Sequence, residues 1–269
     1  MILVYMVLLF ILGILLGHLF VKIGYILGKK DSITSINFNC DSCSHKLNIF
    51  EKLYITRLLT HKGRCKYCNE RIKRSNALLE LLTGVLFALA LYVNKETDLV
   101  FLNTLLYIVF FSGLIIITSS DYHHMIIPDV ILVILGISII ALKVIIGINM
   151  EELTNTMDIG YNIIFMLLDA AIMFIIMYVL QKIGNVLFKT KSLGFGDVKL
   201  MVILALMLGY KMSIVCLFIS CFMALPIAIY NLQKKDKKLL PFGPYLAFGA
   251  IILVLCQIDF DMIIDFIRR

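Results

Sequence analysis

The chain has 269 residues, of which 61% are hydrophobic and 16% are charged, and its formal net charge is +7. Soluble domains are about 45–50% apolar, so this composition excludes an ordinary soluble enzyme and indicates a protein in contact with a lipid bilayer. The basic excess does not point to nucleic acid, because no base-stacking or groove-reading motif accompanies it.

Apolar runs of about 20 residues, each long enough to cross a bilayer as a helix, recur along the chain. We predict an all-α polytopic membrane protein with about eight transmembrane helices and no strands, because an open sheet edge cannot face lipid. The predicted spans are 2–24, 77–94, 99–119, 127–147, 159–181, 198–210, 212–230 and 241–262. The first has no basic segment before it and no cleavage site after it, so it is expected to act as an anchor.

A polar block follows the first span and contains four cysteines. They form two Cys-x-x-Cys pairs with 21 residues between them: Cys40 with Cys43, and Cys65 with Cys68. This spacing predicts a closed, structural zinc site, or one for another thiophilic metal, with no open position for catalysis. Two disulfides or four free thiols are the alternatives, and a reducing cytoplasm argues against disulfides. We therefore expect a first membrane anchor over 1–28 and a small zinc-binding domain over 29–76.

The distribution of lysine and arginine predicts the orientation. With the N-terminus outside, 20 of the 25 basic residues lie in cytoplasmic segments, including the cysteine domain. The five on the outer side are Lys95, Lys143, Lys211, Arg268 and Arg269. This orientation brings the cytoplasmic ends of the third and sixth spans to one membrane face.

An aspartate lies at each of these two span ends. Asp121 closes the third span, and Asp197 opens the sixth. A carboxylate at membrane depth is costly and tends to mark a functional site. Two of them on one face suggest a pair that shares a proton and activates water. Asp169, in the middle of the fifth span, is a functional candidate for the same reason, but no motif surrounds it.

The residues around the two aspartates also have structural interpretations. Gly194 and Gly196 permit a close approach of another segment before Asp197, which itself could simply be a helix N-cap. Lys199 could be a positive-inside residue. Pro128 suits the first turn of the fourth span, and Asp129 the N-terminus of that helix. Adjacent His123 and His124 are expected in a solvated loop, because neighbouring positions do not share a helix face.

In these motifs the chain resembles the type IV prepilin leader peptidases, intramembrane aspartyl proteases of the Gly-x-Gly-Asp type. The resemblance covers most of the chain. It is carried by Asp121 with Ile127-Pro128-Asp129, by Gly194-Phe195-Gly196-Asp197 with Lys199, by the four-cysteine block, by Arg64, and by Glu80 at the start of the second span. The order, spacing and shared membrane face of these motifs make it specific.

The resemblance implies a transmembrane peptidase domain over 77–269 of a bacterial cytoplasmic-membrane protein. One of Asp121 and Asp197 would be ionised and would take a proton from water, while the other would hydrogen-bond the scissile carbonyl. No metal would take part in proteolysis. The implied substrates are prepilin or pseudopilin precursors, cleaved after a short basic leader at the cytoplasmic face.

Many relatives of this type also methylate the new N-terminus with S-adenosylmethionine, and Glu80 is the candidate residue for that step. Here the resemblance weakens, because Glu51-Lys52-Leu53-Tyr54 stands where the family often has Asp-Asn-Ile-Pro. Two other functions stay open. One is a different Gly-x-Gly-Asp protease acting on signal peptides or single-span proteins. The other is a non-enzymatic scaffold or transporter subunit with a zinc module.

Overall fold

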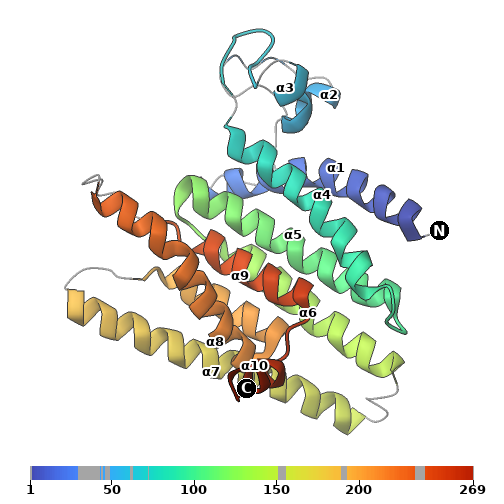
Figure 1. Ribbon diagram of the computed structural model, residues 1–269, viewed down its shortest axis with the longest axis vertical. Coiled ribbons are helices and arrows are strands. Elements are labelled where there is room, and N and C mark those ends of the chain that lie inside the picture. Colours follow the sequence, from blue (N-terminus) through green and yellow to red (C-terminus); the bar gives the residue numbers. More distant parts are fainter. Residues whose placement is uncertain are drawn as a thin grey trace.

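A computed structural model describes residues 2–29, 43, 45, 49–60, 63–71, 73–150, 156–188, 193–233 and 240–268. In this part of the chain, helices form the whole regular structure, apart from one isolated antiparallel bridge between Arg64 and Arg71. The helices are α1 (Ile2–Gly28), α2 (Ile49–Lys52), α3 (Tyr54–Thr60), α4 (Arg74–Asn94), α5 (Val100–His124), α6 (Asp129–Asn149), α7 (Thr156–Phe188), α8 (Phe195–Gln233), α9 (Gly243–Cys256) and α10 (Phe260–Arg268). Figure 1 shows the long helices side by side, with α2 and α3 at one edge.

Six of these helices are long and apolar enough to cross a membrane: α1, α4, α5, α6, α7 and α8. The prediction of an all-α polytopic membrane protein is therefore confirmed. The first five predicted spans each correspond to one helix. The sixth and seventh both lie in α8, and the eighth corresponds to α9, which has only 14 residues.

The two predicted spans in α8 are separated at Gly209, whose φ of 78° and ψ of 162° are not helical. We call residues 195–208 the first arm and residues 210–233 the second arm. The second arm returns toward the start of the first, because the Ser220 hydroxyl donates to the Tyr245 carbonyl at 3.0 Å, and the neighbouring Gly243 contacts Asp121 near Asp197. In one straight helix, Asp197 and Ser220 would be about 35 Å apart.

The eighth span is shorter than the predicted range of 241–262. The helix α9 ends at Cys256 because Gln257 adopts a left-handed conformation, and the backbone N–H groups of Gln257 and Ile258 bond back to Val254 and Leu253. This is a common way to satisfy the free carbonyls of a helix end. Residues 260–268 then form the separate helix α10.

Small residues let α1 pack closely on α4. A Cβ on Gly13 would lie 2.7 Å from the Gly84 Cα, and a Cβ on Gly84 would lie 2.9 Å from the Phe10 carbonyl oxygen. Such glycine contacts are a common basis for helix association in membranes. Gly24 and Gly28, further along α1, meet α5 in the same way.

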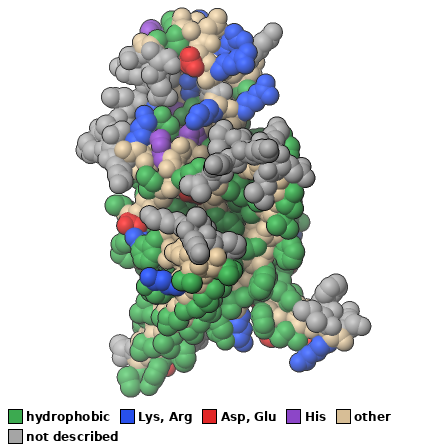
Figure 2. Space-filling model, turned by 90° about the vertical axis from the view of Figure 1, so that its left-hand side faces the viewer, with side chains coloured by type: hydrophobic (Ala, Val, Ile, Leu, Met, Phe, Trp, Pro, Cys, Tyr) green, Lys and Arg blue, Asp and Glu red, His purple; other side chains and the backbone are tan. Residues whose placement is uncertain are grey.

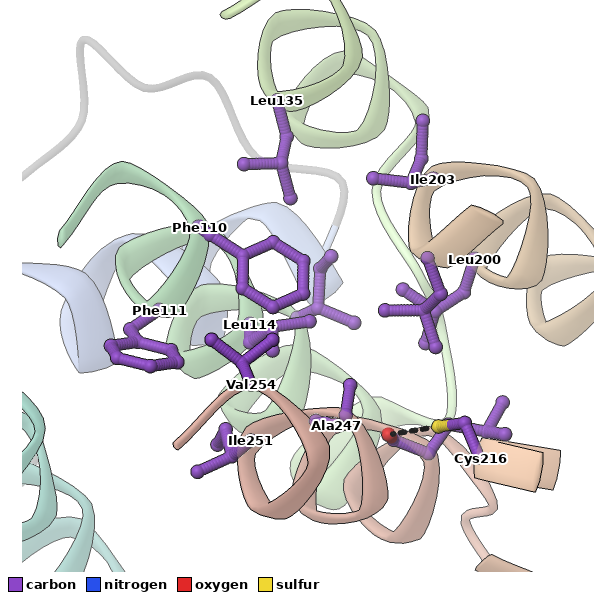
Figure 3. Packing of buried hydrophobic residues seen from close by; sticks show 14 of the residues in the cluster. Phe110, Phe111, Leu114, Leu135, Leu200, Ile203, Cys216, Ala247, Ile251 and Val254 are labelled. Carbon is purple, nitrogen blue, oxygen red and sulfur yellow. Dashed lines mark hydrogen bonds between the residues drawn. The ribbon is translucent and has the colours of Figure 1, made fainter. Parts of the chain in front are cut away.

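The centre of the bundle is an apolar core shared by α5, α6, α8 and α9. Figure 3 shows Phe110 and Leu114 of α5 facing Leu135 of α6 and Leu200 of α8. From the other side α9 packs onto the second arm, where the Cys216 thiol donates to the Leu246 carbonyl at 3.5 Å. This core holds together the helix ends that carry the polar site.

Candidate active site

Asp121 lies in the last turn of α5 and is 6% exposed. Its carboxylate meets the start of α9, where the Gly243 backbone N–H donates to Oδ2 at 2.9 Å. A Cβ on Gly243 would lie 2.7 Å from that oxygen, so the contact requires glycine. The first N–H groups of a helix have no partner within the helix and suit an anionic side chain.

Asp197 lies in the first turn of α8 and is 8% exposed. The helix begins at Phe195, so Asp197 is its third residue, and the sequence-based alternative of a simple N-cap does not describe its position. A Cβ on Gly194 would lie 3.0 Å from the Asp197 Oδ2, and one on Gly196 would lie 3.1 Å from the Ile127 Cβ. Gly196 therefore permits the close approach of another segment, as predicted, whereas Gly194 makes room for the side chain of Asp197 itself; neither glycine has a positive φ.

The two aspartates, 76 positions apart in the sequence, face one cavity of about 270 Å³. It is lined by Asp121, Met125, Ile126, Ile127, Asp129, Gly194, Phe195, Gly196, Asp197 and Lys199. The carboxylates are near enough to interact electrostatically. A water molecule occupies about 30 Å³ of liquid, so the cavity has room for several waters. Together these features could hold a water between two carboxyl groups.

An ion pair lies at the rim of this cavity. The Lys199 Nζ is 2.7 Å from Oδ1 of Asp129, whose side chain is 66% exposed, and it also lies 5.1 Å from the centre of the Phe195 ring. Exposed pairs of this kind contribute about 0–1 kcal/mol. Pro128 is buried directly before α6 as its N-cap and does not line the cavity.

An apolar hollow lies on another side of the Asp121 turn. Its volume is about 480 Å³, and it is lined by Tyr122, Met223, Ile227, Leu240, Pro241, Pro244, Tyr245 and Phe248. Tyr122 follows Asp121 and Pro244 follows Gly243, so the hollow lies one residue along the chain from each partner of the Asp121–Gly243 contact, although neither partner lines it. An apolar segment of a bound molecule that lies next to Asp121 could pack against this apolar lining.

The two histidines after Asp121 are not in a solvated loop, so that expectation is wrong. They form the end of α5 and are half-buried. The Nδ1 of His123 is 2.8 Å from the Ser119 carbonyl, and the His124 ring packs 5.1 Å from the Tyr25 ring of α1. The close passage of α1 at Gly28 covers them.

Three of the four predicted metal ligands lie together. The Sγ atoms of Cys43, Cys65 and Cys68 are within 4.8 Å of one another, while Cys40 lies outside the described residues. Thiolates around one tetrahedral zinc are about 3.8 Å apart, given Zn–S bonds of about 2.3 Å. The three therefore fit a thiophilic metal. Figure 2 shows many basic side chains and histidines at this end of the molecule, above a largely hydrophobic surface.

Glu80 is buried at the junction between α4 and α3, outside the residues that line the Asp121–Asp197 cavity. Its Oε2 accepts hydrogen bonds from the backbone N–H groups of Tyr54 at 2.7 Å and Ile55 at 3.2 Å. Its Oε1 is also buried and has no hydrogen-bond partner among the described residues. This carboxylate thus ties the start of α3 to the membrane helices.

Gly243 is a site residue that sequence reasoning missed. The signal was present in Phe242-Gly243-Pro244, because a glycine before a proline often marks the start of a helix. Nothing local, however, indicates that this helix end meets a residue 122 positions earlier.

The fold and the site together define the class of this protein: it is a polytopic helical membrane protein in which two buried aspartates face one cavity. The sequence pattern of the type IV leader peptidase family matches residues 108–229, which include both aspartates. The pattern of the bacterial peptidase A24 N-terminal domain matches residues 11–94, which include the four cysteines and Glu80.

Similar proteins have corresponding names. A prepilin leader peptidase/N-methyltransferase of Bacillus subtilis (strain 168) is 30% identical over 96% of both chains. A type 4 prepilin-like proteins leader peptide-processing enzyme of Escherichia coli O78:H11 is 27% identical over 85% of this chain and 78% of its own. A prepilin leader peptidase/N-methyltransferase of Pseudomonas putida is 22% identical over 80% of this chain and 70% of its own. No solved structure gives a significant match.

This chain belongs to the type IV leader peptidase family. It is a peptidase and a multi-pass protein of the bacterial inner membrane. The alternative of a non-enzymatic scaffold or transporter subunit has no support in these findings.

Proposed function

We propose that this protein is an intramembrane aspartyl endopeptidase that removes the leader from prepilin or pseudopilin precursors, with Asp121 and Asp197 as its catalytic pair. One observation carries the proposal: two buried aspartates from distant parts of the chain face a single cavity with room for water. The names of the relatives support the class of substrate.

In the proposed reaction the pair shares one proton, because two adjacent carboxylates do not readily carry two charges. The ionised carboxylate removes a proton from a water in the cavity. That water attacks the scissile carbonyl, whose oxygen accepts a hydrogen bond from the protonated carboxyl group. The Gly243 N–H holds the Asp121 carboxylate in place throughout, and the same pair then returns a proton to the leaving amine.

The apolar hollow beside Asp121 supports a substrate whose scissile bond is followed by a hydrophobic helix. The lining of the hollow includes Tyr122, which directly follows the catalytic residue in the sequence, and Phe248 on α9. We infer that the hydrophobic segment of the precursor lies here, while the basic leader passes the open rim that carries Asp129 and Lys199.

The proposed orientation places the N-terminus outside and the cavity at the cytoplasmic face. It rests on the count of basic residues and on the basic end visible in Figure 2. We further propose a three-part organisation, with residues 1–28 as an anchor, 29–76 as a cytoplasmic zinc domain and 77–269 as the peptidase domain. Zinc at Cys40, Cys43, Cys65 and Cys68 would stabilise the small domain and take no part in cleavage.

A second proposed activity is methylation of the new N-terminus with S-adenosylmethionine. The name of the Bacillus subtilis relative, which is similar over 96% of this chain, favours it. The geometry gives Glu80 a definite contact, with the backbone of α3. We infer that Glu80 would support methylation by docking this segment on the membrane helices.

The decisive experiment compares purified wild type with Asp121→Asn and Asp197→Asn, each incubated with a pilin-like precursor in detergent or vesicles. Each variant should lose leader cleavage while it remains folded, and Asp98→Asn, a change at an exposed carboxylate outside the cavity, should retain it. The product's N-terminal sequence and mass separate cleavage from cleavage with methylation. Full processing by either active-site variant would overturn the proposal.

A further inference from the structure

The break in α8 at Gly209, between the sixth and seventh predicted spans, leaves helix carbonyls without partners inside their own helix. The last four carbonyls of any helix lack partners within the helix. Leu206 is buried and Met207 is partly buried, so their carbonyls need donors from neighbouring helices. The positive φ of Gly209 fixes where the first arm ends.

Lys143 of α6 supplies donors at this point. Its Nζ donates to the Leu206 carbonyl at 2.8 Å and to the Met207 carbonyl at 2.8 Å. A cation at a helix C-terminus also interacts favourably with the helix dipole. On the far side of the turn, the Ser213 hydroxyl donates to the Gly209 carbonyl at 2.8 Å. From the distribution of basic residues, Lys143 was expected to be one of the few lysines on the outer side of the membrane. In the structure its side chain points into the helix bundle, where it contacts α8.

Asp169 of α7 completes the group. It interacts electrostatically with Lys143, and a Cβ on Gly209 would lie 3.4 Å from its Oδ2. Asp169 had no recognisable motif in the sequence, yet a charged side chain in a span needs a partner. Here it provides a negative charge for the lysine at the turn.

The first arm is attached to α6, and to the residues just before it, at several levels. Near Asp197, Gly196 packs on Ile127, and the Lys199 ammonium binds Asp129. Midway, a Cβ on Gly136 would lie 3.0 Å from the Ile203 Cδ1. At the far end of the arm, Lys143 binds the carbonyls of Leu206 and Met207. Apolar contacts are non-directional, whereas hydrogen bonds require a defined geometry, so the lysine can fix how far the arm slides along α6.

We infer that Lys143, with Asp169 as its counter-charge, is a positioning residue for the proposed peptidase: it fixes the register of the first arm on α6 and thereby holds Asp197 opposite Asp121. The inference rests on the proposed function. The arm is a single helix, and Asp197 lies about 15 Å along it from Met207. A shift at the carbonyl end is therefore transmitted to the carboxylate.

The test measures kcat and KM for precursor cleavage in Lys143→Met, Lys143→Arg and the double variant Lys143→Met with Asp169→Asn. Lys143→Met should lower kcat by about tenfold or more with KM within about twofold, since a 1 Å misplacement can cost about 100-fold. Lys143→Arg keeps charged donors and should recover most of the rate. The double variant also removes the partly buried carboxylate that Lys143→Met leaves without its counter-charge, so it should regain stability but not kcat.

Amide hydrogen exchange over residues 193–208 provides a second readout that needs no substrate. Exchange should become faster in Lys143→Met and return toward wild type in Lys143→Arg. Lys211→Met, which alters an exposed lysine just beyond the turn, is the matched control. If wild type cleaves no precursor, the proposed function fails and exchange alone decides the inference.

Two results would overturn the inference. One is a folded Lys143→Met protein whose kcat and exchange match those of Lys211→Met. The other is a double variant that recovers both stability and kcat, because the lysine would then only balance the charge of Asp169.

Discussion

The contact between Gly243 and Asp121 gives a prediction of defined size. In Gly243→Ala the new Cβ would start 2.7 Å from Oδ2, whereas ordinary contacts begin at about 3.4 Å, so the carboxylate or α9 must move by about 0.7 Å. Misplacing a catalytic group by about 1 Å can cost about 100-fold. We expect kcat to fall by about 10- to 100-fold, equivalent to about 1.4–2.7 kcal/mol of transition-state stabilisation, with KM little changed.

The backbone N–H remains in Gly243→Ala, and alanine is the better helix former, so the change tests the position of the carboxylate and not the stability of α9. Gly249→Ala is the matched control. It lies in the same helix, and its Cβ would be equally crowded, at 2.8 Å from the Ser220 Oγ, but away from Asp121. Steady-state cleavage of a precursor, with thermal unfolding of each variant, provides the measurement. A folded Gly243→Ala enzyme with the kcat of Gly249→Ala would refute the reasoning.

Three further predictions concern regions outside the Asp121–Asp197 cavity. Cys65→Ser should abolish stoichiometric metal binding, measured by elemental analysis, while leader cleavage survives; loss of cleavage in protein that is still folded would contradict a structural role. Glu80→Gln should speed amide exchange over 54–60 and reduce methylation more than cleavage; unchanged exchange would argue against docking. Phe248 is exposed in the hollow, and Phe248→Ala should raise KM for a full precursor by about fivefold, or roughly 1 kcal/mol, because the substrate would no longer cover this ring. Phe165→Ala, at an exposed ring on α7, is the control and should leave KM unchanged. An equal KM in the two variants would place the substrate elsewhere.

Much of the architecture follows from local sequence. Each apolar run forms a helix because a membrane-spanning backbone must satisfy its own hydrogen bonds. Asp121 and Asp197 are visible for the same reason, since a carboxylate at a span end stands out against its apolar neighbours. The Cys-x-x-Cys spacing likewise brings neighbouring thiols together without any knowledge of the rest of the fold.

Other features depend on where the helices meet. Gly243 carries no local sign that its N–H will bind Asp121, because the two are 122 positions apart. The same holds for Lys143, which counts as one basic residue in a charge tally but donates to carbonyls 63 and 64 positions later. His123 and His124 are half-buried because α1 packs against them, and the residues around them in the sequence give no sign of that contact.

Composition, periodicity and short spacings are properties of neighbouring residues, so they were enough to predict a helical membrane protein with two candidate aspartates and a four-cysteine block. Only the folded chain shows that the aspartates share a cavity, that α8 folds back at Gly209, that α9 contacts Asp121 and that Lys143 contacts the first arm of α8. Those outcomes follow from packing between segments far apart in the chain, where a few directional hydrogen bonds fix positions that hydrophobic burial alone leaves free.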